Sequence, residues 1–258
     1  MKTLDVIDLG RQPYQRVLEL QRAIRLGRLD GSVTSDTLLL VEHEPVFTVG
    51  RGGRESSLPL SREALRERGA EVIEIERGGD VTWHGPGQLV GYPIIDLSKH
   101  REDLHWYLRT LEEALIGALD TLGIPAERNP GKTGVWTRGR KIASMGVHVK
   151  QWVTLHGFAL NVAPDLEWFN LIVPCGIDGV EMTSVRREVD SPESDGALWL
   201  RSRDAVTAAL GRAFGLQPHE RAAGELPPTT SAFATQGPRE DDRSVLATLA
   251  IDPPTGNP

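Results

Sequence analysis

A glycine-rich segment between two strand-like runs constrains the fold of this chain most. Residues 77–88 read RGGDVTWHGPGQ and hold four glycines and a proline, and the runs EVIEI and LVGYPII flank them. Glycine allows positive φ and the close approach of another group, so this segment is built for more than a change of direction. We predict a rigid loop that directs its own N–H groups, Arg77 and His84 toward a bound molecule. A tight, irregular hairpin without a ligand is the alternative.

Strand and helix patterns are interspersed along the chain without strict β–α–β alternation. Apolar alternation predicts strands, and 3.6-residue periodicity with capping residues predicts helices. The expected strands are 2–9, 37–43, 47–50, 71–76, 88–97 and a three-stranded meander over 134–162. The expected helices follow Pro13 and Ser61 and cover 103–122, 164–170 and 196–214. This order favours an α/β (α+β) fold with a mixed β-sheet flanked by helices.

The C-terminal region differs in composition from the rest. Seven of the 17 prolines lie in residues 217–258, which have few large apolar side chains and no periodicity. Such a segment cannot bury enough surface to offset its chain entropy. We therefore expect a single catalytic domain over 1–216 and a disordered Pro-rich tail over 217–258. The polar run 186–196 is expected to be a mobile loop.

Cysteine usage and the N-terminus bear on the compartment. The single cysteine excludes an internal disulfide, which fits a reducing environment. Asp5 and Asp8 stand where a signal peptide would be apolar, and no apolar run approaches the roughly 18 residues of a membrane span. We expect a soluble, cytoplasmic protein with no membrane partner.

The charge distribution bears on possible partners. A net charge of −7 argues against nucleic acid as the main partner. Residues 128–150 are the local exception, with six Lys or Arg and no Asp or Glu. This basic segment is either a docking surface for an acidic partner or a solvated hairpin with charged tips.

Cys175, in LIVPCGID, is either a small buried hydrophobe or a nucleophile. Pro174 and Gly176 place it at a turn, where reactive groups are commonly found. Lowering a thiol pKa from about 8.5 to about 7 requires about 2 kcal/mol of preferential stabilisation of the thiolate, which one nearby cation can supply. Lys141 is a candidate because it lies in the strand-like run RKIASMGVHV. A surface lysine at a hairpin tip is the alternative.

Other chemistries lack their motifs. The chain has no HExxH, and one cysteine cannot build a common zinc site, so we expect no metal. GPGQLVG has the wrong spacing for a dinucleotide fingerprint, and neither a P-loop nor a GxSxG elbow is present.

Four motifs in order carry a family resemblance: RGGDVTWHGPGQLVGYPIIDL, RKIASMGVHV, HGFALNV and PCGI. Over residues 3–215 the chain resembles the lipoyl(octanoyl) transferases, also called lipoate biosynthesis protein B. The resemblance implies the fold of biotin and lipoate protein ligase catalytic domains. It also implies transfer of an octanoyl group from octanoyl-acyl carrier protein, through a cysteine thioester, to a lysine of lipoyl domains. The acceptors include 2-oxoacid dehydrogenases and the glycine cleavage H protein, and the enzyme is expected to be a monomer without a cofactor.

The resemblance also assigns residues. It implies that Cys175 carries the acyl group and that Lys141 lowers the pKa of its thiol. We further expect Arg77 and His84 to orient the acyl carbonyl or the pantetheine arm, and N–H groups near Met145 or Gly176 to form the oxyanion site. The implied substrate-binding residues are Arg77, Gly78, Gly79, Asp80, Val81, Thr82, Trp83, His84, Ser144, Met145, Gly146, Gly157, Phe158 and Ala159.

Two other functions stay open. An ATP-dependent lipoate or biotin ligase on the same fold would need no nucleophilic cysteine. Such ligases typically carry an Asp after the motif histidine and a further Arg and Gly before the motif, whereas Gly85 follows His84 and Glu76 precedes Arg77 here. An inactive carrier-protein-binding module is the second alternative, although the chain retains both Cys175 and Lys141.

Overall fold

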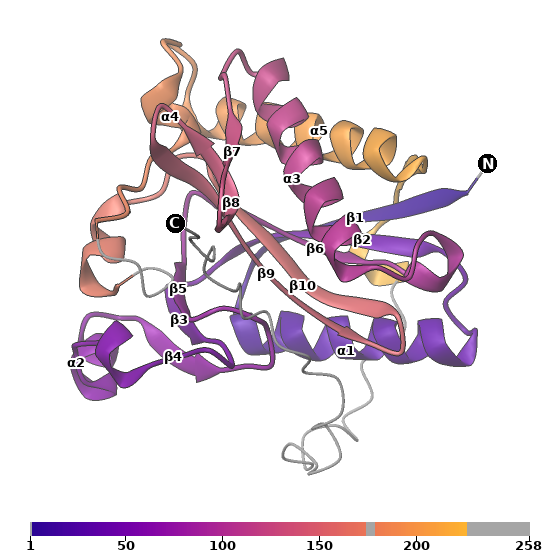
Figure 1. Cartoon of the computed structure of the whole chain (residues 1–258), viewed down its shortest axis with the longest axis horizontal. Coiled ribbons are helices and arrows are strands. Elements are labelled where there is room, and N and C mark those ends of the chain that lie inside the picture. The colour runs from indigo at the N-terminus through magenta and orange to yellow at the C-terminus, as the bar shows by residue number, and fades with distance from the viewer. Residues whose placement is uncertain (1, 174–178, 226–258) are drawn as a thin grey trace, which may run out of the picture.

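A large mixed β-sheet divides the molecule into two layers (Figure 1). The computed structural model describes residues 2–173 and 179–225, so Cys175 lies outside the described residues. The sheet has eight strands in the order β11-β1-β2-β6-β10-β9-β8-β7. Their bounds are β1 Thr3–Gln12, β2 Asp36–His43, β6 Gln88–Ile94, β7 Glu127–Asn129, β8 Lys132–Thr137, β9 Arg140–Lys150, β10 Val153–Asn161 and β11 Gln217–Glu220. The predicted meander is confirmed as β8, β9 and β10.

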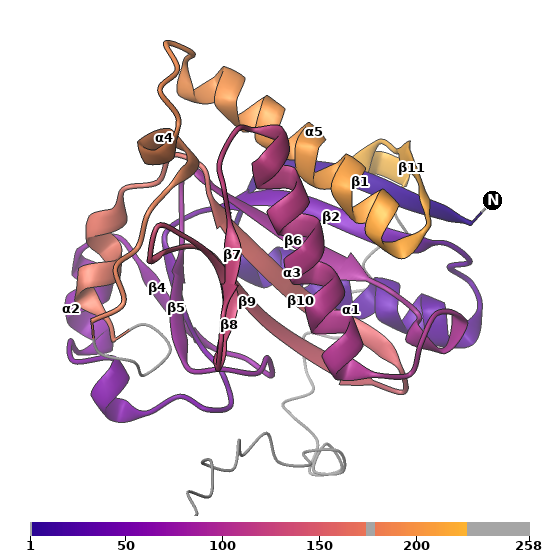
Figure 2. The same cartoon turned by 45° about the horizontal axis from the view of Figure 1, so that its top comes forward.

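Three long helices cover the two faces of this sheet. They are α1 Tyr14–Asp30, α3 Leu104–Thr121 and α5 Asp195–Phe214. Helix α1 lies on one face, and α3 and α5 pack together on the other (Figures 1 and 2). Asp103 caps α3 by accepting the N–H of Trp106, and Ser194 caps α5 in the same way. No helix within 2–173 or 179–225 combines the length and the apolar character that crossing a membrane demands.

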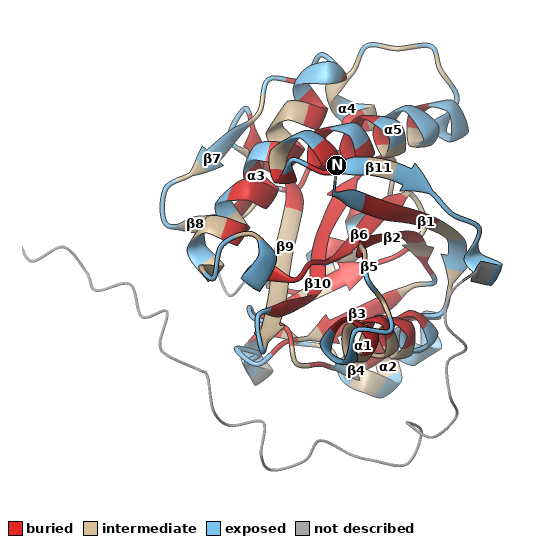
Figure 3. Cartoon of the chain, turned by 90° about the vertical axis from the view of Figure 1, so that its right-hand side faces the viewer, coloured by how far each residue is buried: buried red, intermediate tan, exposed pale blue. Residues whose placement is uncertain are grey.

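Two apolar layers hold the helices to the sheet, as the burial colours show (Figure 3). The stripe predicted on 103–122 is buried: Tyr107, Leu111, Leu115 and Leu119 lie in the layer beneath α3 and α5. On the opposite face, Val17 and Ile24 of α1 pack against the sheet. The helix stripes predicted from periodicity therefore face the sheet.

A second, three-stranded sheet stands beside the first. Its order is β4-β3-β5, with β3 Val46–Val49, β4 Glu71–Glu74 and β5 Val81–His84. The 3₁₀ turn η1 Glu55–Ser57 and helix α2 Arg62–Glu67 connect β3 to β4, and Ser61 caps α2 as predicted. A third core cluster packs this sheet against η3 Leu166–Leu171, a 3₁₀ helix where the sequence predicted a short helix.

The glycine-rich segment is only partly a loop. Its centre is β5, in which buried Val81 and Trp83 alternate with half-buried Thr82. Strand β5 pairs with β3, whereas β6 pairs with β2 and β10. The segment therefore carries the chain from the small sheet to the large one, and the hairpin alternative is wrong.

The polar run 186–196 has more local structure than expected. Helix α4 Val185–Glu188 takes up its first residues, and α5 begins at Asp195. From α4, Arg186 donates hydrogen bonds to the Ser191 and Glu193 carbonyls, which lie between the two helices, and to the Asp195 carboxylate at the start of α5. The Arg186 guanidinium thus holds residues 191–195 in place, although the run 186–196 has no apolar pattern.

The expected domain end at residue 216 does not coincide with the end of the sheet. Strand β11 adds a parallel edge strand to β1, and the turn η5 Ala223–Glu225 follows it. The Gln217 N–H donates to the Lys2 carbonyl and the Arg221 N–H to that of Val6. Main-chain pairing needs no apolar side chain, so composition did not reveal this strand. Residues 226–258 of the predicted tail lie outside the described residues.

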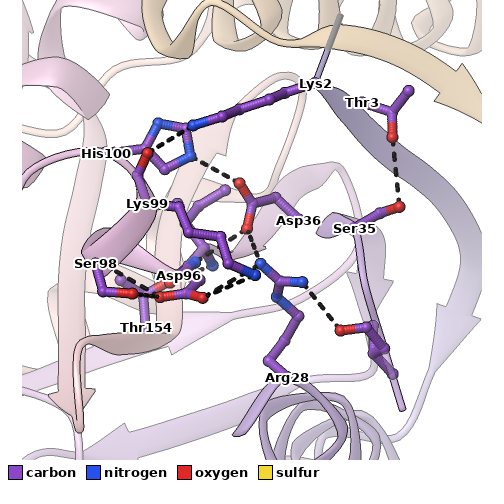
Figure 4. A network of polar contacts seen from close by, with 12 residues as sticks. Lys2, Thr3, Arg28, Ser35, Asp36, Asp96, Ser98, Lys99, His100 and Thr154 are labelled. Carbon is purple, nitrogen blue, oxygen red and sulfur yellow. Dashed lines mark hydrogen bonds and ion pairs between the residues drawn. The ribbon is translucent and has the colours of Figure 1, made fainter. Parts of the chain in front are cut away.

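A buried polar network fastens one end of the molecule (Figure 4). The Arg28 guanidinium, at the end of α1, lies 2.9 Å from one Asp36 carboxylate oxygen and 3.6 Å from Asp96. His100 lies 2.8 Å from the other Asp36 oxygen. The network joins α1 to the start of β2 and to the 3₁₀ turn η2 Leu97–Lys99. Because both Arg28 and Asp36 are buried, their charges depend on the partners within this network for compensation.

Candidate active site

A cavity of about 50 Å³ lies where the small sheet meets the large one. It collects residues from all three predicted substrate-binding segments: Arg77, Gly79, Asp80, Val81, Thr82 and His84; Ser144, Met145 and Gly146; and Gly157, Phe158 and Ala159. Four more residues line it that the sequence interpretation missed, namely Tyr14, Val90, Tyr92 and His156. Tyr14 lies on a helix distant in the chain, and no motif marks it.

Strand register explains why two of the segments meet. Strands β9 and β10 are antiparallel, and Gly157 pairs with Gly146, Phe158 with Met145, and Ala159 with Ser144. The third segment reaches them through one main-chain hydrogen bond, in which the Gly78 N–H donates to the Val147 carbonyl at 2.9 Å. The cavity is therefore enclosed between β5 with its preceding turn and the surface of β9 and β10.

Two of the predicted substrate-binding residues do not line the cavity, and neither does Lys141. Gly78 makes the main-chain bond to β9 and does not line the cavity wall. Trp83 is fully buried in the core of the small sheet, where it stacks on Trp168 at 5.8 Å and meets Phe169 edge-on. Side chains alternate along β5, so Thr82 and His84 face the cavity while Trp83 faces away.

Arg77 is largely engaged within the protein. Its guanidinium donates to the Thr48 carbonyl at 2.6 Å, to the Thr48 hydroxyl at 2.9 Å and to the Gly78 carbonyl at 3.0 Å. The side chain passes close to Gly50 and Gly146, where an added Cβ would meet it at 2.8 and 3.0 Å. Arg77 therefore braces the cavity wall that it lines, and its binding of a ligand stays a prediction.

Asp80 has an anchoring role that extends toward the cysteine. Its carboxylate accepts the Ser57 hydroxyl at 2.5 Å and the Arg54 N–H at 3.2 Å. The Ser57 carbonyl in turn accepts the Val173 N–H at 3.0 Å. Val173 precedes Cys175 by two residues, so Asp80 and Ser57 hold the chain where it enters the undescribed segment 174–178.

Lys141 is buried, so the surface-lysine alternative is wrong. Its residue is 3% exposed, and its ammonium lies 5.6 Å from the centre of the Trp136 ring. The side chain passes over Gly134, where an added Cβ would lie 2.7 Å from the Lys141 Cε. The Lys141 N–H donates to the Glu181 carbonyl, and the Lys141 carbonyl accepts the Thr183 N–H. The chain leaving segment 174–178 is thus paired to Lys141 itself.

Buried rings surround His84. It stacks on Tyr14 with centroids 5.9 Å apart, and burial lowers the pKa of His84 to about 3. Beside it, the His43 Nδ1–H donates to the Gln12 carbonyl, and the Tyr92 hydroxyl donates to His43 Nε2 at 2.8 Å. Burial lowers the pKa of His43 to about 4. Both imidazoles are therefore neutral at pH 7.

The basic segment 128–150 is not a free positive surface. Arg138 and Arg140 both form ion pairs with the buried Glu188 carboxylate, at 3.1 and 2.8 Å. Arg128 pairs with the buried Glu112 at 3.1 Å. The acidic partners come from other elements, so the run of charge in the sequence did not reveal them.

A different basic pair stands by the cavity wall. Arg51 and Arg54 are exposed, and their side chains form no ion pair with any residue of the described ranges. Their loop is hydrogen-bonded to the cavity segment: the Arg51 N–H donates to the Arg77 carbonyl and the Gly52 N–H to that of Gly79. Over 2–173 and 179–225, no group of three or more His, Cys, Asp or Glu side chains could hold a metal.

The fold is that of lipoate protein ligases. A crystal structure of lipoate-protein ligase A bound with ATP superposes with a TM-score of 0.69 at 16% identity, covering 87% of this chain and 90% of that one. In sequence, the chain belongs to the lipoyl protein ligase A/B catalytic domain family, whose model matches residues 13–197.

Within that family the similar curated proteins are octanoyltransferases. That of Geobacter metallireducens is 49% identical over 72% of this chain and 83% of its own length. That of Geobacter sulfurreducens is 41% identical over 97% of this chain and 98% of its own length. The resemblance inferred from the four motifs is confirmed.

Proposed function

We propose that this protein transfers an octanoyl group from octanoyl-acyl carrier protein, through a thioester on Cys175, to a lysine of lipoyl domains. One observation carries the proposal: three segments separated in sequence enclose a single cavity, and buried Lys141 is paired with the chain that follows the cysteine. The relatives named octanoyltransferase support the identity of the acyl group.

The proposed chemistry has two steps. In the first, the Cys175 thiolate, stabilised by the Lys141 ammonium, attacks the donor thioester carbonyl, and the donor C–S bond breaks to release the carrier thiol. In the second, the acceptor amine attacks the enzyme thioester, an amide forms, and the Cys175 sulfur is released. Exchange between thioesters is nearly balanced in free energy and aminolysis is downhill, so neither step requires ATP.

The flanks of segment 174–178 support this pairing of groups. Val173 is fixed to Ser57 at one end, and Glu181–Thr183 are fixed to Lys141 at the other. The chain therefore enters the undescribed segment at Ser57 and leaves it at Lys141.

The cavity walls suit an acyl chain. Met145, Phe158, Ala159 and Val90 supply apolar surface, and six methylenes would gain up to about 5 kcal/mol if fully buried. About 50 Å³ is well below the several hundred Å³ of typical ligand pockets, so a wall side chain must move to admit the chain. Half-buried Met145 is the candidate, because its unbranched side chain changes rotamer readily.

The edge of β9 supports an oxyanion site near Met145. Strand β8 pairs with β9 only over Arg140–Ala143, whereas Ser144, Met145 and Gly146 line the cavity. Main-chain N–H groups fixed in a strand need no reorganisation as negative charge develops on the carbonyl oxygen.

The exposed arginines support an acidic donor. We propose that Arg51 and Arg54 meet the carrier protein, in place of the basic segment 128–150, whose arginines are paired internally. The acceptors proposed are lipoyl domains of 2-oxoacid dehydrogenases and the glycine cleavage H protein. We also propose a monomer in the cytoplasm, a compartment that suits a reduced thiol nucleophile.

Intact-protein mass spectrometry tests the proposal. After mixing with octanoyl-acyl carrier protein, the wild type should gain one octanoyl group that hydroxylamine removes, and Cys175→Ser should gain none. Addition of a lipoyl domain should then move the group to the acceptor. Acylation of Cys175→Ser to the same extent, or acylation only with free octanoate and ATP, would contradict the proposal and favour the ligase alternative.

A further inference from the structure

A chain of buried hydrogen bonds connects His84 in the cavity with the main chain of Lys141. His84 Nδ1 lies 2.7 Å from the Gln88 side-chain oxygen, and the Gln88 amide nitrogen lies 2.9 Å from the Asn161 side-chain oxygen. The Asn161 amide nitrogen lies 2.9 Å from the Thr183 carbonyl, and the Thr183 N–H donates to the Lys141 carbonyl at 2.9 Å. Gln88, Asn161 and Thr183 are each no more than 1% exposed.

The direction of every bond in this chain is determined. A main-chain carbonyl can only accept, so the Asn161 group facing Thr183 is its NH₂, and its oxygen faces Gln88. The Gln88 NH₂ also lies 3.3 Å from the Trp83 carbonyl, which fixes the same orientation independently. The Gln88 oxygen therefore faces His84, and His84 Nδ1 must carry the hydrogen.

The tautomer decides what His84 can bind. With the hydrogen on Nδ1, the Nε2 of a neutral imidazole has only a lone pair. His84 lines the cavity and is 7% exposed, and its Nε2 has no hydrogen-bond partner among the described residues. A lone pair cannot hold an acyl carbonyl oxygen, so our expectation that His84 orients the acyl carbonyl is inconsistent with this geometry. The group that it binds must be a hydrogen-bond donor, and the N–H of an amine is one.

We propose that Gln88 and Asn161 are positioning residues that fix His84 so that its Nε2 accepts a hydrogen bond from the attacking lysine amine of the acceptor protein. This inference rests on the proposed function and adds a role that operates in the second step only. An oriented amine presents its own lone pair to the thioester carbonyl, which is the geometric condition for attack.

Two features support an amine as the ligand. Burial lowers the pKa of His84 to about 3, so the ring stays uncharged and retains its lone pair over the working pH range. The hydrogen-bond chain ends on the strand that carries Lys141, so the acceptor-binding group and the proposed activating group share one rigid unit. The amide N–H of the donor's pantetheine arm is the other possible source, and the test separates the two.

The test measures the two half-reactions separately in Gln88→Met and Asn161→Asp. Both variants break the chain while His84 keeps its imidazole. Acylation of the enzyme by octanoyl-acyl carrier protein should stay near the wild-type rate, and transfer from the isolated acyl-enzyme to a lipoyl domain should slow about tenfold. Cleavage of the acyl-enzyme by hydroxylamine is the control for intrinsic thioester reactivity and should not change.

Nitrogen NMR of the His84 ring supplies a readout that loss of packing alone would not mimic. In the wild type, Nδ1 should be protonated and Nε2 unprotonated near pH 7, and Gln88→Met should mix the tautomers. A protonated Nε2 in the wild type overturns the inference even if neither variant folds. Equal slowing of both half-reactions, or slowing of the donor step alone, also overturns it. Absence of any acyl-enzyme in the wild type contradicts the proposed function instead.

Discussion

Gly134→Ala tests whether the Lys141 ammonium is held in place by the strand beside it. A Cβ at position 134 would lie 2.7 Å from the Lys141 Cε, 3.3 Å from its Nζ and 2.7 Å from the Ala143 carbonyl oxygen. The lysine side chain can rotate away, and a small shift of the β8–β9 backbone must relieve the contact with the Ala143 carbonyl. The substitution should therefore displace the ammonium without removing it from the protein.

The expected magnitude follows from the thiol equilibrium. We proposed that the Lys141 ammonium holds the pKa of the Cys175 thiol at about 7, and its displacement should return that pKa toward about 8.5. The fraction of thiolate at pH 7 then falls from about one half to about 3%. The rate of alkylation of Cys175 by iodoacetamide at pH 7 should then fall roughly 15-fold. The deficit should largely disappear at about pH 9, where either thiol is mostly ionised.

Gly131→Ala is the matched control. Gly131 precedes the same strand and has a φ of 75°, so alanine there suffers left-handed strain as it would at Gly134, where φ is 130°. Nothing lies within 4 Å of a Cβ at 131, so Lys141 is undisturbed. An unchanged pH profile in Gly134→Ala, or the same shift in Gly131→Ala, would refute the reasoning.

Three further predictions follow from contacts in the fold. Gly91→Ala would place a Cβ 2.1 Å from the Phe158 ring and push that ring into the cavity. The preference in kcat/KM should then shift toward acyl chains shorter than octanoyl by about 1–3 kcal/mol per methylene, measured with a series of thioester substrates. Asp36→Asn removes the nearer of the two carboxylates beside the buried Arg28 guanidinium, leaves Asp96 at 3.6 Å, and should lower the free energy of unfolding by up to about 3–5 kcal/mol in urea denaturation. The pKa of His43 is about 4 in the folded protein and about 6.5 when unfolded, so the unfolded chain binds more protons between these values. Stability should fall as pH drops from 6.5 to 4, and His43→Gln should flatten that slope by up to about 1.4 kcal/mol per pH unit.

The sequence predicted elements well where apolar periodicity and capping agree. The helix at 103–122 has a continuous apolar stripe and Asp103 as its cap, and α3 runs from Leu104 to Thr121. The meander over 134–162 has turn residues at 138–140 and 150–151, and the structure turns there with positive φ at Arg138 and Gln151. In these elements local preference and tertiary packing favour the same conformation.

Prediction was weaker where the deciding partner is distant in the sequence. For Arg138 and Arg140 the sequence left open a docking surface or a solvated hairpin, because Glu188, their common partner, lies about 50 residues away. The motif predicted Trp83 to be a substrate-binding residue, yet side chains alternate along β5 and that of Trp83 lies in the core. A motif identifies a segment, but the strand register selects which of its side chains face the cavity.

Glycines within strands show how this site is specified. Glycine weakens an isolated strand, so Gly91, Gly134, Gly146 and Gly157 would count against the strands that contain them. In the structure, a Cβ added at Gly91 would strike the Phe158 ring, and one at Gly134 the Lys141 side chain. A Cβ at Gly146 would strike the Arg77 side chain, and one at Gly157 the Gly91 carbonyl. The missing side chains at Gly91 and Gly146 make room for Phe158 and Arg77, which line the cavity, and that at Gly134 makes room for Lys141. The loss of intrinsic strand preference at Gly91, Gly134 and Gly146 is thus offset by large side chains from neighbouring positions, which pack where the glycines leave room.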